Sequence, residues 1–340
     1  MTNIEIARQF ALRFQEDLEQ GKLNKKQLAR LMMGDHPGRW SNLERARSDV
    51  RRATGADKCP GVKAAFEFKS TIEHGIRALK CAVKPVKHYD LAPGQTVGVI
   101  SDVHLPYHDP LALESALAFL FDRGIDTLLL NGDILDFYGI SRFNRDPSAM
   151  PVHEELDIGR GFLRAIREQF QGKIVYSIGN HEARLEHYLW SKAPEIAKLE
   201  GLTLGAQLHA SEYGVDMVDS AAIVRVGAHQ NGEFKPYLNI IHGHEFGEST
   251  FSPVNPARGL FLRAKCSTLA GHNHQTSEHH ENSLNGDSMA CWSTGCLCSL
   301  EPAYRPFAFT KWNHGFAVVE IETDGKFTVH NHRIIDGKVH

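Results

Sequence analysis

From residue 96 onwards, short apolar segments alternate with longer segments whose apolar residues recur at helical spacing. The segments expected as strands are 96–101, 126–133 and 173–179, and those expected as helices are 111–124, 152–170 and 182–190. Strands that alternate with helices form βαβ units, in which helices cover the faces of a mainly parallel sheet. The sequence therefore predicts an α/β catalytic region in this part of the chain.

The later segments differ, because little helical pattern separates their strands. The expected strands are 238–243, 267–271, 289–295, 316–322 and 326–330, and one helix is expected near 256–265. We therefore expect a second sheet, and a β-sandwich flanked by helices over residues 91–340.

The first 90 residues have a different charge and a different pattern. They contain 18 Lys and Arg against 11 Asp and Glu, whereas the other 250 residues contain 20 against 30. Helical spacing covers residues 3–33, and Ser41 is a candidate cap for a second helix that carries arginines. A linker is expected near 84–95, where two prolines and a glycine occur. Residues 1–90 are thus expected to form a small, all-helical, basic module.

Composition places the chain among ordinary globular proteins, with 42% hydrophobic and 23% charged residues. The charged N-terminus lacks the apolar run of a signal peptide, and no segment reaches the roughly 20 apolar residues of a membrane span. The six cysteines follow no disulfide framework, so a cytoplasmic location with free thiols is expected. Cys291, Cys296 and Cys298 fit no common zinc spacing and are interpreted as core thiols.

Five of the expected strands end in polar side chains that bind metals. These residues are Asp102 and His104, Asp133, Asn180 and His181, His242, and His272 and His274. A single Asp-x-His after a strand is commonly a turn, but five such ends in one order are hard to explain as caps. Burying several carboxylates and imidazoles together is costly unless cations compensate them. Mixed oxygen and nitrogen donors favour Mn, Fe, Zn, Ni or Co over calcium.

This order of motifs resembles the calcineurin-like metallophosphoesterase superfamily, in which D-x-H, G-D, G-N-H, H and G-H-x-H follow one another. In this chain the motifs are Asp102–Val103–His104, Gly132–Asp133, Gly179–Asn180–His181–Glu182, His242–Gly243 and Gly271–His272–Asn273–His274. The resemblance covers about residues 96–330, and the layout with an N-terminal helical region is similar to phage and prophage members.

The resemblance implies two divalent transition-metal ions, with manganese favoured, and a set of ligands for each. One ion would be held by Asp102, His104, Asp133 and His274, and the other by Asp133, Asn180, His242 and His272. Water activated between the ions would attack phosphorus while His181 protonates the leaving group. Asp136 matches a position that orients this histidine; a helix cap is the alternative.

Some assignments stay open at this stage. His244 competes with His242, and the position directly before glycine favours His242. Arg184 could reach a substrate phosphate, or it could pair with Glu182 or Glu186 in solvent.

Departures from known subfamilies bear on the substrate. Protein phosphatases of the superfamily carry arginine where this chain has Phe137, and its repair nucleases usually carry histidine where it has Asp136. The phosphatase arginine grips a phosphomonoester dianion, so its absence disfavours a protein phosphatase, and the repair nucleases are not matched cleanly either. The expected activity is hydrolysis of phosphodiesters in nucleic acid or nucleotides. A phosphomonoesterase acting on nucleotides or phosphoproteins is the alternative, and a non-catalytic DNA-binding regulator is a weaker one.

The basic helical module is the other clue to substrate. Its arginine-rich segment presents Arg45, Arg47, Arg51 and Arg52 and is compatible with a helix-turn-helix that binds nucleic acid. A solvated helical cap on the catalytic domain is the competing interpretation. The oligomeric state is not predicted, and no membrane partner is expected.

Overall fold

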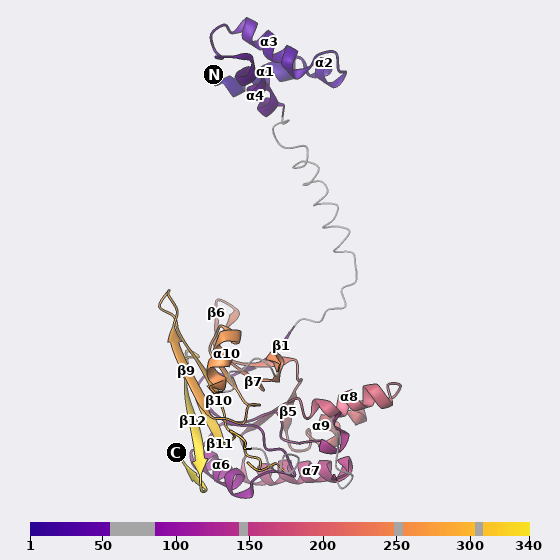
Figure 1. Cartoon of the computed structure of the whole chain (residues 1–340), viewed down its shortest axis with the longest axis vertical. Helices are drawn as coiled ribbons and strands as arrows, with labels where there is room; N and C mark the ends of the chain where they lie inside the picture. The colour runs from indigo at the N-terminus through magenta and orange to yellow at the C-terminus, as the bar shows by residue number, and fades with distance from the viewer. Residues whose placement is uncertain (55–85, 143–148, 248–253, 303–308) are drawn as a thin grey trace. The chain divides into compact units, whose positions relative to one another are not determined.

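The computed structural model describes residues 1–54, 86–142, 149–247, 254–302 and 309–340 (Figure 1). It divides into two compact units, Met1–Lys84 and Pro85–His340. The thiols of Cys59 and Cys81, the end of the second expected helix at Gly55 and the start of the expected linker lie outside the described residues.

The first unit is helical throughout its described part. Its helices are α1 (Asn3–Arg13), α2 (Gln15–Glu19), α3 (Lys25–Asp35) and α4 (Leu43–Ala53). Apolar residues of α1, α3 and α4 bury one small core, which includes Phe10, Met32 and Val50. The expected Ser41 cap is wrong by one residue, because Asn42 caps α4 by accepting a hydrogen bond from the backbone N–H of Arg45.

The larger sheet of the second unit has seven strands. They are β2 (Gln95–Ile100), β3 (Thr127–Asn131), β4 (Lys173–Ser177), β5 (Val215–Val218), β11 (His314–Ile321), β12 (Phe327–Ile335) and β13 (Lys338–Val339). Their spatial order is β13-β12-β11-β2-β3-β4-β5, and β2 to β5 run parallel. The parallel part corresponds to the βαβ units that the sequence predicts.

The second sheet has six strands. They are β1 (Lys87–Leu91), β6 (Ala222–Gln230), β7 (Glu233–Ile241), β8 (Thr268–Ala270), β9 (Ser277–Asn282) and β10 (Ser288–Ser293). Their order is β1-β6-β7-β8-β10-β9, with β7, β8 and β10 parallel. The expected linker at 84–95 is therefore partly wrong, since β1 lies within it and pairs with β6.

Helices cover the outer faces of both sheets (Figure 1). The helices of this unit are α6 (Pro110–Asp122), α7 (Val152–Gln169), α8 (Ala183–Lys192), α9 (Leu204–Gln207) and α10 (Pro256–Ala264). Short 3₁₀ turns are η1 (Tyr138–Ile140), η2 (Glu200–Leu202) and η3 (His244–Phe246). Within the described ranges no helix combines the length and the apolarity that crossing a membrane requires.

Strand alternation builds two cores on the two faces of the larger sheet. In β3, Leu128 and Leu130 pack toward α6 and α7, whereas Leu129 packs toward the second sheet. In β2, Val97 and Val99 also face the second sheet. Because successive side chains of a strand point to opposite faces, a fully apolar strand needs a layer on each side. The result is the expected β-sandwich flanked by helices.

Candidate metal centre

The strand ends that the sequence singles out come together where the two sheets meet. Asp102, Asp133 and Asn180 follow β2, β3 and β4 of one sheet, and His242 and His272 follow β7 and β8 of the other. The backbone N–H of His272 donates to both carboxylate oxygens of Asp102, at 3.1 and 2.9 Å, and so joins the two sheets. The carboxyl ends of parallel strands are where α/β sheets bind ligands.

Asp133 lies in the middle of these residues. Its Oδ2 is 3.0 Å from His242 Nε2, 3.8 Å from His181 Nε2 and 4.0 Å from His104 Nε2. Its Oδ1 accepts a hydrogen bond of 2.9 Å from the backbone N–H of His181. One carboxylate therefore faces imidazoles that come from both sheets.

A second cluster forms around Asp102 on the other side of His104. Asp102 Oδ1 is 3.1 Å from His274 Nε2 and 4.0 Å from His104 Nε2, and the two imidazole nitrogens are 3.1 Å apart. Burial favours the neutral acid at Asp102, but the imidazoles of His274 and His242 outweigh it and hold the pKa below its usual value. Asp102 is completely buried, so this charge depends on its neighbours.

The geometry separates His242 from its competitor His244. His242 is fully buried, and its Nδ1 donates to the backbone carbonyl of Asn131 at 2.8 Å, which turns Nε2 toward Asp133. His244 begins η3 and lies beside Glu245 instead. Its ring centroid is 6.3 Å from that of His272, whereas His242 and His272 are 5.2 Å apart.

The backbone around the cluster is strained. Asp102, His104, Asp133, His272 and His274 all have positive φ angles, between 52° and 65°, and are five of the ten such non-glycine residues described. The neighbouring glycines allow close approach: a Cβ at Gly132 would lie 2.5 Å from His242 Nδ1, and one at Gly271 would lie 2.0 Å from Ser101 Oγ. Left-handed backbone at polar residues is costly and concentrates at functional sites.

Asp136 contacts both His104 and the histidine that it was expected to orient, His181. Its Oδ2 accepts from His104 Nδ1 at 2.8 Å but is 3.4 Å from His181 Nδ1. His181 Nδ1 donates instead to the backbone carbonyl of Asp136 at 2.9 Å. Burial opposes ionisation of Asp136, yet its contacts with His104 and His181 outweigh burial and keep its pKa low. Asp136 thus orients the expected ligand His104 by its side chain and His181 mainly by its backbone.

Arg184 lies in the site and does not pair with Glu182 or Glu186. From the first turn of α8 its Nη1 donates to the backbone carbonyl of Asp136 at 2.9 Å, and its Nη2 donates to His181 Nε2 at 3.0 Å. Its side chain is 19% exposed, so the guanidinium is held at the edge of the cluster and remains accessible.

Glu182 has a role that the sequence did not predict. Oε1 accepts from the backbone N–H groups of Ile134 and Leu135 and from the Tyr176 hydroxyl, and Oε2 accepts from those of Asp133 and Gly179. Burial raises the pKa of Glu182, and the donated hydrogen bonds oppose that shift. This carboxylate faces the backbone of the loops that carry the expected metal ligands and fixes their path. In the sequence, the only signal of such a role is a glutamate directly after the Gly-Asn-His motif.

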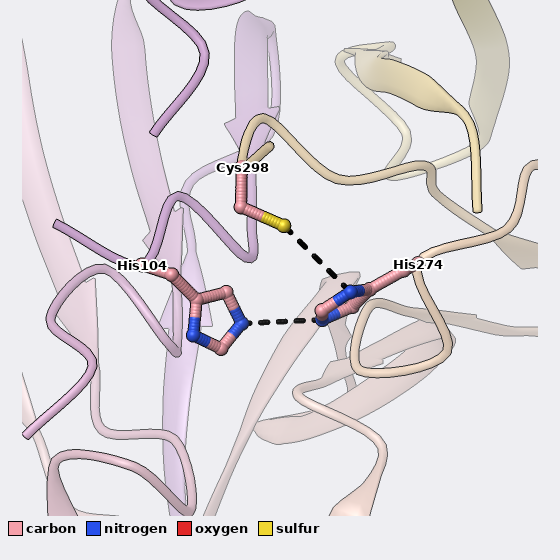
Figure 2. Close-up of side chains that lie close together, drawn as sticks. All are labelled: His104, His274 and Cys298. Atoms are coloured by element: carbon pink, nitrogen blue, oxygen red, sulfur yellow. Dashed lines mark hydrogen bonds between the residues drawn. The ribbon is translucent and has the colours of Figure 1, made fainter. Parts of the chain in front are cut away.

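Cys298 also reaches the cluster, although its thiol was expected only to fill the core. Figure 2 shows His274 between His104 and Cys298, with one ring nitrogen directed toward each of them. Cys298 Sγ is 3.8 Å from His274 Nδ1 and is buried. The thiols of Cys291 and Cys296 are buried as well, and Cys291 lies in the apolar core under α10.

The arginines of α4 do not form one uniform face. Arg47 Nη1 is 3.3 Å from Glu44, and Arg52 Nη1 is 3.9 Å from Asp49, so two of the four have acidic neighbours on their own helix. Arg45 is exposed, and Arg51 is half-buried. Residues seven apart share a helix face, which places Arg45 and Arg52 together.

The side chains fit a pair of divalent ions. Two groups meet at Asp133 with all ligand atoms of each within 4.8 Å of one another, one with His104 and His181 and one with His242 and His272. A third group of the same kind joins His104, His274 and Cys298. Asn180 Oδ1 and His242 Nε2 are among eleven buried side-chain polar atoms of the described residues that have no hydrogen-bond partner. Buried polar atoms are rarely left in that state, and both are expected ligand atoms. Carboxylate, amide and imidazole donors together suit a transition metal.

Comparison with known proteins agrees with the motif order. The sequence profile of the calcineurin-like phosphoesterase family matches residues 95–294. The "Gene 54 protein" of Mycobacterium phage L5 is 25% identical over 234 residues, covering 66% of this chain and 88% of that protein. Its namesake in Mycobacterium phage D29 is 25% identical over 260 residues, covering 69% and 96%.

Two solved structures are similar to part of this chain. Vps29 complexed with zinc, from Entamoeba histolytica, has a TM-score of 0.34 and 15% identity over 72% of this chain and 96% of its own. A dimetal phosphatase from Danio rerio has a TM-score of 0.34 and 12% identity over 70% and 96%. The matched profile spans more than half of the sequence and includes the strand ends described above. This chain therefore belongs to the calcineurin-like phosphoesterase family.

Proposed function

We propose that this protein is a dinuclear-metal-dependent hydrolase that cleaves phosphodiester bonds in nucleic acid or nucleotides. The observation that carries the proposal is the position of Asp133, whose carboxylate lies between two groups of metal-binding side chains. Asp102, His104, Asp133 and His274 would hold one ion, and Asp133, Asn180, His242 and His272 the other. Such ions would supply an activated water and would stabilise charge on the phosphoryl oxygens.

The remaining residues act on the leaving group and on the phosphoryl oxygens. His181 is the proposed general acid, because its Nε2 lies 3.8 Å from Asp133 Oδ2 at the edge of the cluster. Arg184 is proposed to bind a phosphoryl oxygen through its guanidinium. This group contacts His181 and both the backbone carbonyl and the carboxylate of Asp136, and it has five N–H donors in total.

The contact between these two residues sets their order of action. A guanidinium has donors only, so His181 Nε2 accepts from Arg184 while Nδ1 carries the proton toward Asp136. To act as a general acid, His181 first has to take up a proton from solvent at Nε2 and become an imidazolium, which requires Nε2 to be released by Arg184. Arg184 therefore has to turn from His181 toward the substrate before His181 donates a proton.

Phe137 supports a diester over a monoester. This residue occupies the position where protein phosphatases of the family pattern carry arginine, and its side chain is fully buried in the core. Its backbone N–H donates to Glu155 Oε1. A diester carries one negative charge at phosphorus and a monoester dianion carries two, so the absence of an arginine at this position favours the less charged diester.

A phosphomonoesterase is the second candidate, and Arg184 is the observation that favours it. Guanidinium groups bind phosphate oxygens in a bidentate manner, and Arg184 offers such a group next to His181. The two candidates differ in which model substrate turns over faster.

The experiment compares hydrolysis of bis-p-nitrophenyl phosphate and p-nitrophenyl phosphate by the full chain loaded with manganese. A higher kcat/KM for the diester supports the proposal, because both substrates release the same nitrophenolate. A higher kcat/KM for the monoester would favour the second candidate. No hydrolysis of either substrate with any of Mn, Zn, Fe, Ni or Co would contradict a catalytic role.

Nucleic acid is proposed as the substrate class because of the basic helical unit. Arg45 and Arg52 on one face of α4 are the proposed phosphate contacts. The double variant Arg45→Ala/Arg52→Ala should weaken binding of single- or double-stranded DNA and lower the slope of log Kd against log salt by about two. Unchanged DNA binding, with Lys22→Ala/Lys25→Ala as the matched charge control, would refute this role of α4.

A further inference from the structure

Three imidazoles of the proposed metal centre share one arrangement. Each turns Nε2 toward the carboxylates Asp102 and Asp133 and turns Nδ1 toward a group outside the cluster. His104 Nδ1 meets the carboxylate of Asp136 at 2.8 Å, and His242 Nδ1 meets the carbonyl of Asn131 at 2.8 Å. The third imidazole, His274, has the Cys298 thiol at the equivalent place, 3.8 Å from Nδ1.

The position of the sulfur distinguishes two roles for Cys298. A thiolate ligand would face the same point as the Nε2 atoms of His104 and His274, which are 3.1 Å apart. Figure 2 shows the sulfur at the other nitrogen of the His274 ring, away from the contact with His104. A hydrogen-bond acceptor for Nδ1–H fits this position, because the two nitrogens of an imidazole point in different directions.

Both partners of this contact are held in place. The backbone carbonyl of Cys298 accepts from His314 Nε2 at 3.0 Å, and Cys298 forms an isolated antiparallel β-bridge with His108. The His274 ring packs edge-on against Trp312, with the ring centroids 4.2 Å apart. The thiol and the imidazole therefore meet in a fixed geometry, and the contact selects one tautomer of His274.

We propose that Cys298 is a positioning residue, whose sulfur accepts the Nδ1–H hydrogen bond of His274 and so presents the Nε2 lone pair to the ion shared with Asp102 and His104. This role rests on the proposed metal centre. Groups outside the ligand shell that orient a metal-binding histidine typically contribute 10- to 100-fold in metal affinity. Sulfur is a weak acceptor, so a serine hydroxyl at this position should accept the same Nδ1–H hydrogen bond and preserve the function.

The test measures metal affinity of the full chain, stripped with EDTA, by zinc titration against a chromophoric chelator. Cys298→Ala should lower the affinity for one of the two ions by about 10-fold and leave the affinity for the other unchanged. Cys298→Ser, which retains an acceptor, should stay within about threefold of the unsubstituted protein. Cys291→Ala is the matched control, because it removes an equally buried thiol that lies in the core under α10.

Each outcome decides between the role and its alternatives. Equal affinity for both ions in Cys298→Ala and in the unsubstituted chain would overturn the positioning role and leave the metal centre intact. An equal loss in Cys291→Ala would show that any buried thiol matters for packing, and would also overturn it. If the unsubstituted chain binds no ion, the proposed function itself fails, and the role of Cys298 fails with it.

Discussion

At the scale of single residues, Glu182 carries the densest set of contacts around the metal-binding loops. Four backbone N–H groups and one tyrosine hydroxyl donate to its two oxygens. Glu182→Ala leaves these buried donors without an acceptor and should destabilise the second unit by about 3 kcal/mol or more. The loss is measured by chemical denaturation of the metal-free protein, so that it reports folding and not lost metal.

The neighbouring Glu186 supplies the control for this prediction. It is exposed on α8, and Glu186→Ala should change the free energy of unfolding by less than about 0.5 kcal/mol. If Glu182→Ala is as mild as Glu186→Ala, the loop-fixing role of Glu182 is wrong.

His181 is a second residue whose role can be isolated. It touches Asp133 and Asp136 but belongs to neither proposed ligand set, so His181→Ala should keep both ions. The kcat of His181→Ala should fall about 100-fold or more for diesters with alkoxide leaving groups, and much less for nitrophenolate, which needs no proton. The measurement is kcat for a series of leaving groups, together with metal content. An equal loss across the series would contradict the general-acid role.

At the scale of elements, the first turn of α8 places the guanidinium of Arg184 at the site. Arg184→Ala should raise KM for the diester by about 10-fold and weaken inhibition by inorganic phosphate, because a phosphate contact is lost. Arg184→Lys keeps the charge but lacks the planar set of donors, so its KM should lie between those of the unsubstituted protein and Arg184→Ala. A change confined to kcat, with KM and phosphate inhibition unaltered, would assign Arg184 to positioning His181 alone.

The strands that build the site could be predicted from the sequence because they are buried on both faces. β2, β3 and β4 have apolar, buried centres, and the expected ligand motifs follow their carboxyl ends. The edge strands could not be predicted in the same way. β1 (KHYDL) and β9 (SEHHEN) are mostly exposed, and their place in the sheet comes from backbone pairing with β6 and β10.

The sequence pattern also could not predict which side chains of the site contact one another. The resemblance suggested a contact of Asp136 with His181; the Asp136 carboxylate lies 3.4 Å from His181 Nδ1 and also accepts from His104 Nδ1 at 2.8 Å, a second partner that no motif indicated. The contact between Cys298 and His274 joins residues 24 apart through separate loops. Motif order identifies which residues gather, whereas turn geometry decides which side chains touch.

At the scale of the whole second unit, the sandwich makes the proposed dinuclear arrangement possible. One sheet brings Asp102, Asp133 and Asn180 and the other brings the later histidines, so neither sheet holds a full set. Asn131 ties the two at this point: its Nδ2 donates to the Ile241 carbonyl and its own carbonyl accepts from His242, both at 2.8 Å. Metal binding and the packing of the two sheets should therefore support each other.

The most direct test of the account is the metal stoichiometry of the purified full chain beside Asp133→Asn. Asp133 is the one carboxylate assigned to both ions, and the asparagine is nearly isosteric but uncharged. After reconstitution and removal of excess metal, elemental analysis should find two ions per unsubstituted chain and less than about one in the variant, with hydrolysis lost in parallel. Two tightly bound ions in Asp133→Asn, or a single ion in the unsubstituted chain, would contradict a dinuclear centre bridged by this residue.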